Sequence, residues 1–188
     1  MARWEADATG RLREAALELY VERGYEQTTV AEIAQRAGLT ARTFFRHFAD
    51  KREVLFGGTE ALREQLVRGL AAAPESASPL QAVAAALEAA AAQLGRHHDR
   101  SRRRQSVINA HPELRERELI KMASLATALA DGLRRRGVGE PDATLAAEAG
   151  IVVLRVAFER WVAEPADTGL SRAMTEALAQ LRTVTSAG

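Results

Sequence analysis

The segment 36–52 gathers cationic and hydroxyl side chains that could bind a polyanion. It holds five basic residues against a single acid, Asp50, although residues 1–56 carry nine residues of each sign. Arginine and lysine neutralise phosphates, an arginine fork fits O6 and N7 of guanine, and a threonine methyl fits that of thymine. These side chains therefore indicate contacts with duplex DNA. We expect bases to be read by Arg42 and Thr43, and phosphates to be bound by Thr40, Arg46, His47 and Lys51.

Two short helices and a tight turn are predicted to position these side chains. Thr29 can cap a helix over 30–36, with a glutamate three residues later completing a capping box. Gly38 allows the left-handed backbone that ends a helix, and Thr40 can cap a second helix over 41–47. This order is typical of a helix-turn-helix, whose second helix lies in the DNA major groove. Thr29, at the start of the first helix, is a further predicted phosphate contact.

Residues 11–55 resemble the DNA-binding domain of TetR-family transcriptional regulators. The shared pattern begins with Tyr20 and Arg23-Gly24-Tyr25. It continues through Thr-Thr-Val, Ile-Ala, Ala-Gly and Phe-Arg-His-Phe to a lysine and a leucine. The family usually has a tyrosine at position 45, whose hydroxyl meets a phosphate. Phe45 is kept among the predicted DNA-binding positions, but without that hydroxyl its expected role is packing.

The composition of the 188-residue chain restricts its class. The absence of cysteine excludes disulfides and thiolate metal sites. A net charge of +1 means that DNA affinity must come from local patches. We find no signal-peptide pattern and no uncharged apolar run of membrane-spanning length, so a cytoplasmic protein is expected. Abundant alanine and leucine, with only 5% aromatic residues, favour an all-α protein.

About nine helices are predicted, in two domains. Residues 1–52 form a three-helix domain with the helix-turn-helix, and residues 53–188 form a helical bundle for effector binding and dimerisation. A long helix is expected to start near Lys51, behind a cap at Asp50, and to reach Leu70. Loop signals and helical spacing place the later helices at about 79–95, from 96 onward, and at 113–136, 141–163 and 170–183.

The resemblance implies a ligand pocket in the second domain and dimerisation through the last two helices. The predicted pocket positions are mostly apolar, which favours an apolar or amphipathic effector. They are Leu66, Leu87, Ile108, Asn109, His111 and Met122. The predicted interface positions recur at helical spacing along the last two helices. They are Ala149, Val152, Val156, Leu170, Met174, Leu178 and Leu181.

The other polar clusters of the sequence are consistent with more ordinary structural roles. The basic stretch 96–104 is consistent with a solvated face, a second DNA contact or, as the resemblance implies, a helix that relays ligand binding. His97, His98, Asp99 and His111 match no zinc spacing, so no metal or cofactor is predicted. The run from Arg134 to Arg136 is expected at the C-terminus of a helix, where positive charge complements the helix dipole. We find no nucleophile elbow, phosphate loop or dinucleotide fingerprint, so an enzyme is not expected.

The sequence thus predicts a homodimeric transcriptional regulator that binds double-stranded DNA. We expect a repressor that binds a pseudo-palindromic operator and is released by a small molecule. An alternative stays open, in which a helical DNA-binding regulator has no small-molecule effector and is controlled by a protein partner.

Overall fold

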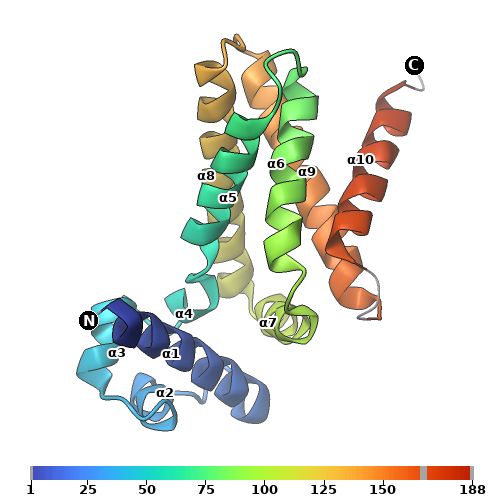
Figure 1. Ribbon diagram of the computed structural model, residues 1–188. Coiled ribbons are helices and arrows are strands. Elements are labelled where there is room, and N and C mark those ends of the chain that lie inside the picture. The colour runs from blue at the N-terminus through green and yellow to red at the C-terminus, as the bar shows by residue number, and fades with distance from the viewer. Residues whose placement is uncertain (1, 166–168, 187–188) are drawn as a thin grey trace. The chain divides into compact units, whose positions relative to one another are not determined.

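The computed structural model describes the backbone of residues 2–165 and 169–186, and the side chains from residue 8 onward in these ranges. Within them the chain is helical and contains no strand, which confirms the predicted all-α class (Figure 1). The described helices are α1 (Ala2–Arg23), α2 (Val30–Arg36), α3 (Ala41–His47), α4 (Glu53–Phe56), α5 (Thr59–Ala72), α6 (Pro79–Leu94), α7 (His98–Ala110), α8 (Pro112–Arg135), α9 (Asp142–Ala163) and α10 (Leu170–Ser186). None of these helices is long and apolar enough to cross a membrane.

The long helix expected from Lys51 is divided into α4 and α5. Asp50 Oδ1 accepts the backbone N–H groups of Arg52 and Glu53 at 2.8 and 3.1 Å, but the N-cap of α4 is Arg52, which makes no side-chain capping bond, so the predicted cap at Asp50 is corrected. Gly57 and Gly58 then follow, and both lie in tight surroundings. A Cβ at Gly57 would lie 3.0 Å from the ring of Phe48. Two glycines in succession lack the helix propensity to carry a helix across such a site, so α4 ends after a single turn.

The chain forms two compact units. Unit 1 comprises Met1–Thr59 and Arg103–Glu118, and unit 2 comprises Glu60–Arg102 and Leu119–Gly188. Helices α7 and α8 therefore contribute residues to both units. The predicted domain boundary after residue 52 rests on the helix-turn-helix motif. The assignment of DNA binding to the first domain, and of effector binding and dimerisation to the second, stays a prediction.

Unit 1 has a core in which the helix-turn-helix shares its apolar side chains with the corner between α7 and α8. Phe44 of α3 is completely buried and lies against Phe48, with ring centroids 5.6 Å apart. Ile108 of α7 and Leu114 of α8 are fully buried in the same cluster. Because burial of such side chains contributes about 1.5–3 kcal/mol each, the α7–α8 corner is part of what stabilises α2 and α3.

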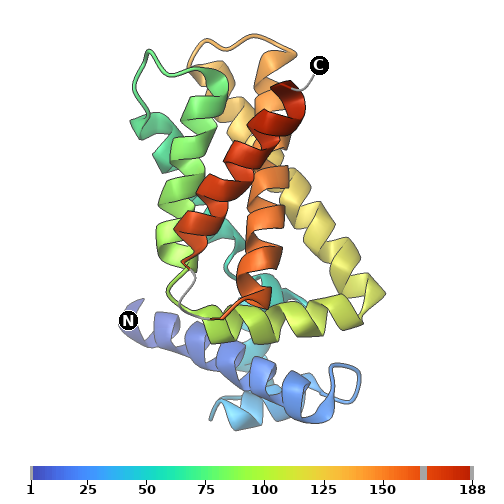
Figure 2. The ribbon, with the colours of Figure 1, turned by 90° about the vertical axis from the view of Figure 1, so that its right-hand side faces the viewer.

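Unit 2 is built around α6, α9 and α10, which lie side by side (Figures 1 and 2). Helix α6 begins with a capping box formed by Ser78 and Gln81, and it presents buried alanines along its length. Small side chains let the helices approach closely. Trp161 of α9 is 1% exposed and is the largest of the fully buried side chains of the described residues.

Candidate nucleic-acid interface

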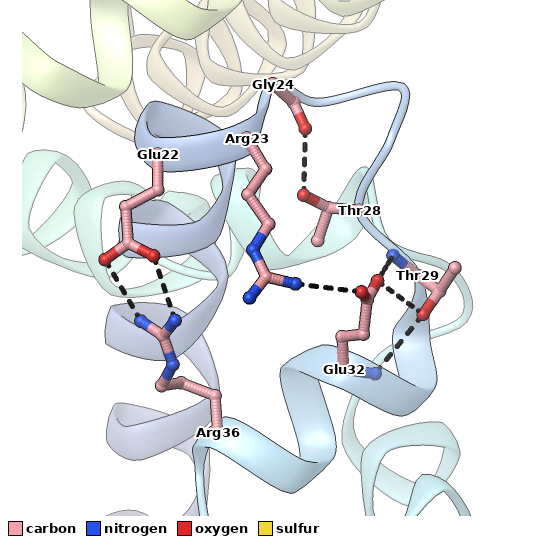
Figure 3. A network of polar contacts seen from close by, with 7 residues as sticks. All are labelled: Glu22, Arg23, Gly24, Thr28, Thr29, Glu32 and Arg36. Atoms are coloured by element: carbon pink, nitrogen blue, oxygen red, sulfur yellow. Dashed lines mark hydrogen bonds and ion pairs between the residues drawn. The ribbon is translucent and has the colours of Figure 1, made fainter.

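Helix α2 has the start that the sequence predicted. Thr29 accepts the backbone N–H of Glu32, and Glu32 Oε2 accepts both the backbone N–H and the hydroxyl of Thr29 at 2.8 Å, so the capping box is confirmed. Figure 3 shows this cap together with Arg23, which donates to Glu32 at 3.1 Å. The hydroxyl proton of Thr29 is donated to Glu32, so this hydroxyl cannot also donate to a phosphate without giving up that bond.

The turn between α2 and α3 is fixed by Gly38. Its φ of 66° lies in the left-handed region, where glycine has no steric penalty. The backbone N–H of Leu39 closes the turn on the carbonyl of Ala34 at 2.8 Å. Thr40 then caps α3 by accepting the N–H of Thr43, and the two threonine hydroxyls lie 3.1 Å apart. If Thr43 donates to Thr40, the proton of Thr40 is available to a phosphate.

Helix α3 presents one exposed face beside its buried Phe44. Arg42, Phe45 and Arg46 are exposed, and Phe45 and Arg46 follow Arg42 by three and four residues, so each is a neighbour of Arg42 on the helix surface. Phe45 was expected only to pack, but 59% of it is exposed, and it touches Phe44 edge-on at 5.5 Å. Its ring therefore offers an apolar surface beside the two cations instead of joining the core.

His47 is directed away from this face. Its Nδ1 lies 3.3 Å from the hydroxyl of Thr9 on α1, and its Nε2 is buried without a hydrogen-bond partner in the described part of the chain. The predicted phosphate contact required an outward ring nitrogen. The structure places both nitrogens inward, so we omit His47 from the proposed contacts.

Lys51 has a structural role that its position in the motif did not reveal. Its Nζ donates to the carbonyls of Tyr25, Glu26 and Thr28 at 2.9, 3.3 and 3.1 Å, and it lies 4.4 Å from the centre of the Tyr25 ring. Three acceptors use all three N–H bonds of an ammonium. Lys51 therefore holds the loop between α1 and α2, and we omit it from the proposed phosphate contacts.

Ion pairs and the hydrogen bonds of Lys51 leave two of the five cations of the segment 36–52 without a partner among the described residues. Arg36 pairs with Glu22 at 2.9 Å (Figure 3). It also pairs with Glu18 at 3.2 Å, and Arg52 pairs with Asp50 at 2.6 Å. The hydrogen bond from Arg36 lowers the pKa of the Glu22 carboxyl. Arg42 and Arg46 have no ion-pair partner among the described residues. Unpaired cations on an exposed helix face are the groups best suited to neutralise phosphates.

The basic stretch 96–104 ends in residues that stabilise unit 1. Arg103 lies 3.3 Å from Glu14 of α1, while Arg104 donates to the carbonyl of Leu55 at 2.7 Å and to Glu118 at 3.1 Å. On α8, Arg117 donates to Glu53 at 2.6 Å. Arg104 and Arg117 thus hold α4 from the α7–α8 corner. Sequence reasoning missed Arg117, because no local pattern links it to a glutamate so far along the chain.

The predicted dimer positions separate into surface and core. Val152 is 43% exposed, and Ala149, Val156, Leu178 and Leu181 are partly buried. Leu145, at the same helical spacing on α9, is 63% exposed. Leu170 and Met174 are only 1% and 3% exposed and belong to the core of unit 2. Their prediction as interface residues is therefore corrected, because the first half of α10 buries its apolar face within its own chain.

The six predicted pocket residues do not surround one hollow. Leu66 and Leu87 are core residues of unit 2, where Met122 packs against them, whereas Ile108 is a core residue of unit 1. Asn109 is exposed and His111 lies against Tyr25. The best-formed hollow in the described part of unit 2 measures about 100 Å³ and is lined by other residues of α8 and α9.

Comparison with known proteins defines the class of this chain. Residues 12–57 match the profile of the bacterial regulatory proteins of the tetR family, and residues 77–186 match that of the MftR C-terminal domain. The chain belongs to the TetR family of bacterial transcriptional regulators. Within that family its second part is of the MftR type, and the helix-turn-helix of α2 and α3 is the DNA-binding domain that the family shares.

The relatives are named as transcriptional regulators and not as enzymes. TcmR of Streptomyces glaucescens is 44% identical over 84 residues, which cover 45% of this chain but only 36% of TcmR. MftR of Mycobacterium tuberculosis, whose assignment to mycofactocin biosynthesis is itself provisional, is 29% identical over 94% of this chain and 88% of its own length. Because the match covers only 36% of TcmR, the activity of the complete TcmR protein does not transfer to this chain.

Solved structures share the fold. SmeT, the repressor of the Stenotrophomonas maltophilia efflux pump SmeDEF, is 21% identical with a TM-score of 0.61, covering 95% of this chain and 91% of SmeT. FadR of Thermus thermophilus, solved with lauroyl-CoA, is 25% identical with a TM-score of 0.55, covering 93% of each chain.

Proposed function

We propose that this chain is a homodimeric repressor that binds a pseudo-palindromic operator with one α3 helix per subunit in the major groove. The observation that carries the proposal is the exposed face of α3, with Arg42 and Arg46, which have no ion-pair partner among the described residues, beside Phe45. A firmly capped turn precedes this face, and a buried Phe44 anchors it. A rigid helix with outward cations meets the requirement of a recognition helix.

Each residue of this face has a proposed role. Arg42 lies in the first turn of α3, the part that contacts base edges in helix-turn-helix proteins, and its fork suits guanine. Thr43 offers its methyl group to a thymine. Arg46, one turn later, binds a phosphate, and the Thr40 hydroxyl donates to a second. Phe45 contributes apolar contact where the family usually has a tyrosine.

Replacing Arg42 by alanine is expected to reduce operator affinity by about 1–3 kcal/mol and to relax preference at one base pair per half-site. The operator is first obtained by selecting bound sequences from random duplexes, and affinity is then measured by fluorescence anisotropy at several salt concentrations. Arg46→Ala should instead weaken binding to all duplexes and reduce the salt slope by about one. Arg68→Ala, which removes an exposed charge from α5, is the control. A wild-type protein that prefers no duplex over bulk DNA would contradict the proposal.

We propose an amphipathic effector, and the lauroyl-CoA complex of Thermus thermophilus FadR supports this chemical class. Pockets for such ligands usually measure about 300–1,000 Å³. The hollow of about 100 Å³ in unit 2 is smaller, so the binding state must be a rarer one in which the helices part. The same small volume favours the alternative candidate, a regulator without a small-molecule effector that responds to a protein partner.

Calorimetric titration with lauroyl-CoA, with and without bound operator, is expected to separate these two candidates. An inducer must bind the operator complex more weakly, by the factor by which it weakens operator binding, commonly about 5- to 150-fold. Equal affinities in the two titrations would mean that lauroyl-CoA is not the effector. No binding of acyl-CoA in either titration would favour control by a protein partner.

A further inference from the structure

Three side chains of unit 1, from two segments that are far apart in the sequence, lie close together in the structure. They are Glu26 from the loop after α1, His111 from the corner between α7 and α8, and Glu113 from the first turn of α8. Each offers one potential ligand atom, and these atoms lie within 4.8 Å of one another. None of the three belongs to the proposed DNA-binding face.

Backbone hydrogen bonds hold His111 and Glu26 in place. The N–H of His111 donates to the carbonyl of Ile108 at 3.2 Å, and its own carbonyl accepts the N–H of Leu114 at 3.1 Å, which fixes the corner before α8. The carbonyl of Glu26 accepts from Lys51. The imidazole lies against Tyr25, with ring centroids 4.9 Å apart. The ligands therefore come from positioned elements, and only their side-chain ends need to move.

The contact between His111 and Glu26 is a loose one. The Nδ1 of His111 lies 4.0 Å from Glu26 Oε1, which is too far for a hydrogen bond. The ligand atoms of two carboxylates and one imidazole lie close together, and a divalent cation would balance the negative charge of the carboxylates.

We propose that Glu26, His111 and Glu113 form a zinc site. One imidazole nitrogen and two carboxylate oxygens are ligands that Zn²⁺ accepts at about 2.0–2.2 Å, with water in the fourth position. Tetrahedral ligands at that distance lie roughly 3.4 Å apart, so the cluster must contract by about 1 Å. The side chain of Glu26 is 65% exposed and can make this movement.

Zinc at this position would tie the α1–α2 loop to the start of α8. Lys51 already holds the same loop by donating to the backbone carbonyls of Tyr25 and Thr28. The metal would further fix this segment, which leads directly into α2. The effect is on the rigidity of unit 1, and it does not depend on which operator or effector the protein has.

The test is titration of chelator-treated full-length protein with Zn²⁺ alone, by calorimetry against a competing chelator. One zinc per chain is expected, with affinity reduced at least tenfold in Glu113→Gln and in Glu26→Gln, since each removes one of three ligands without changing side-chain size. Co²⁺ in place of zinc should give the visible absorption bands of a four-coordinate site in the wild type and lose them in both variants.

Two control variants remove a carboxylate or an imidazole outside the proposed zinc site. Glu116→Gln removes an exposed carboxylate from α8, and His97→Ala removes an exposed imidazole. Both should bind zinc like the wild type. Zinc binding that survives Glu26→Gln and Glu113→Gln unchanged, binding that His97→Ala abolishes, or no binding at all would each overturn the proposal. His111→Asn also removes a ligand, and its circular dichroism spectrum shows whether the contact with Tyr25 was needed for folding.

Discussion

A glutamate in place of Val152 is expected to give monomers and to abolish operator binding at concentrations where the wild type is bound. Val152 lies on the apolar stripe of α9 that includes Leu145, Ala149 and Val156, and it is 43% exposed in the single chain. A charge there costs the isolated subunit little, because the position already faces solvent. In an isologous interface the stripe meets its own copy, so each dimer would bury two unpaired carboxylates. Burial of unpaired charges costs several kcal/mol.

Loss of the dimer removes operator binding because each subunit carries a single recognition helix. Two half-sites are bound together only if the two helices are held about one DNA turn apart. Sedimentation velocity gives the mass, and fluorescence anisotropy gives the affinity. Leu119→Glu is the matched control, since Leu119 of α8 is 60% exposed but lies outside the proposed interface. A Val152→Glu protein that remains dimeric would contradict the assignment of this face, and monomers that still bind the operator tightly would contradict the two-helix arrangement.

The parts of the structure that local sequence determines were predicted correctly. The bounds of α2 and α3 agree with the prediction because caps and a glycine turn set them within a few residues of each helix. Helix α4 was not separated from α5, because the crowding at Gly57 comes from Phe48, which only the folded chain brings near. Local chemistry thus fixes helix ends, while tertiary contacts decide where a helix is interrupted.

The site was less predictable, since several residue types suit two roles. By residue type, Lys51 and His47 can bind a phosphate as well as Arg46 can. Only the tertiary structure turns their side chains toward the protein. Leu170 and Met174 have the spacing of an interface, but an amphipathic helix shows the same spacing whether its apolar face meets its own core or a partner. The convergence of Glu26 with His111 is also beyond sequence reasoning, because no periodicity connects a loop to a distant helix start.

Alanine at Gly69 is expected to destabilise the protein by about 2–3 kcal/mol, although alanine is the best helix former. Gly69 of α5 faces α6, and an added Cβ would lie 2.8 Å from the Cα of Ala86, 2.9 Å from the Cβ of Ala89 and 3.2 Å from the carbonyl oxygen of Ala85. Backbone atoms and alanine methyls cannot rotate away, so the two helices must separate. Gly132 differs, because its added Cβ would meet only the flexible end of Leu70, which can change rotamer.

The matched control is Gly10→Ala in α1, where nothing lies within 4 Å of the added Cβ. That change should stabilise its helix by about 1 kcal/mol, so the two glycine-to-alanine variants are expected to have effects of opposite sign. Urea unfolding followed by circular dichroism measures both, at one fixed protein concentration because the proposed dimerisation would make stability depend on concentration. A Gly69→Ala protein as stable as the wild type would mean that α5 and α6 can move apart at little cost. Such looseness would also supply the opening that an amphipathic effector needs.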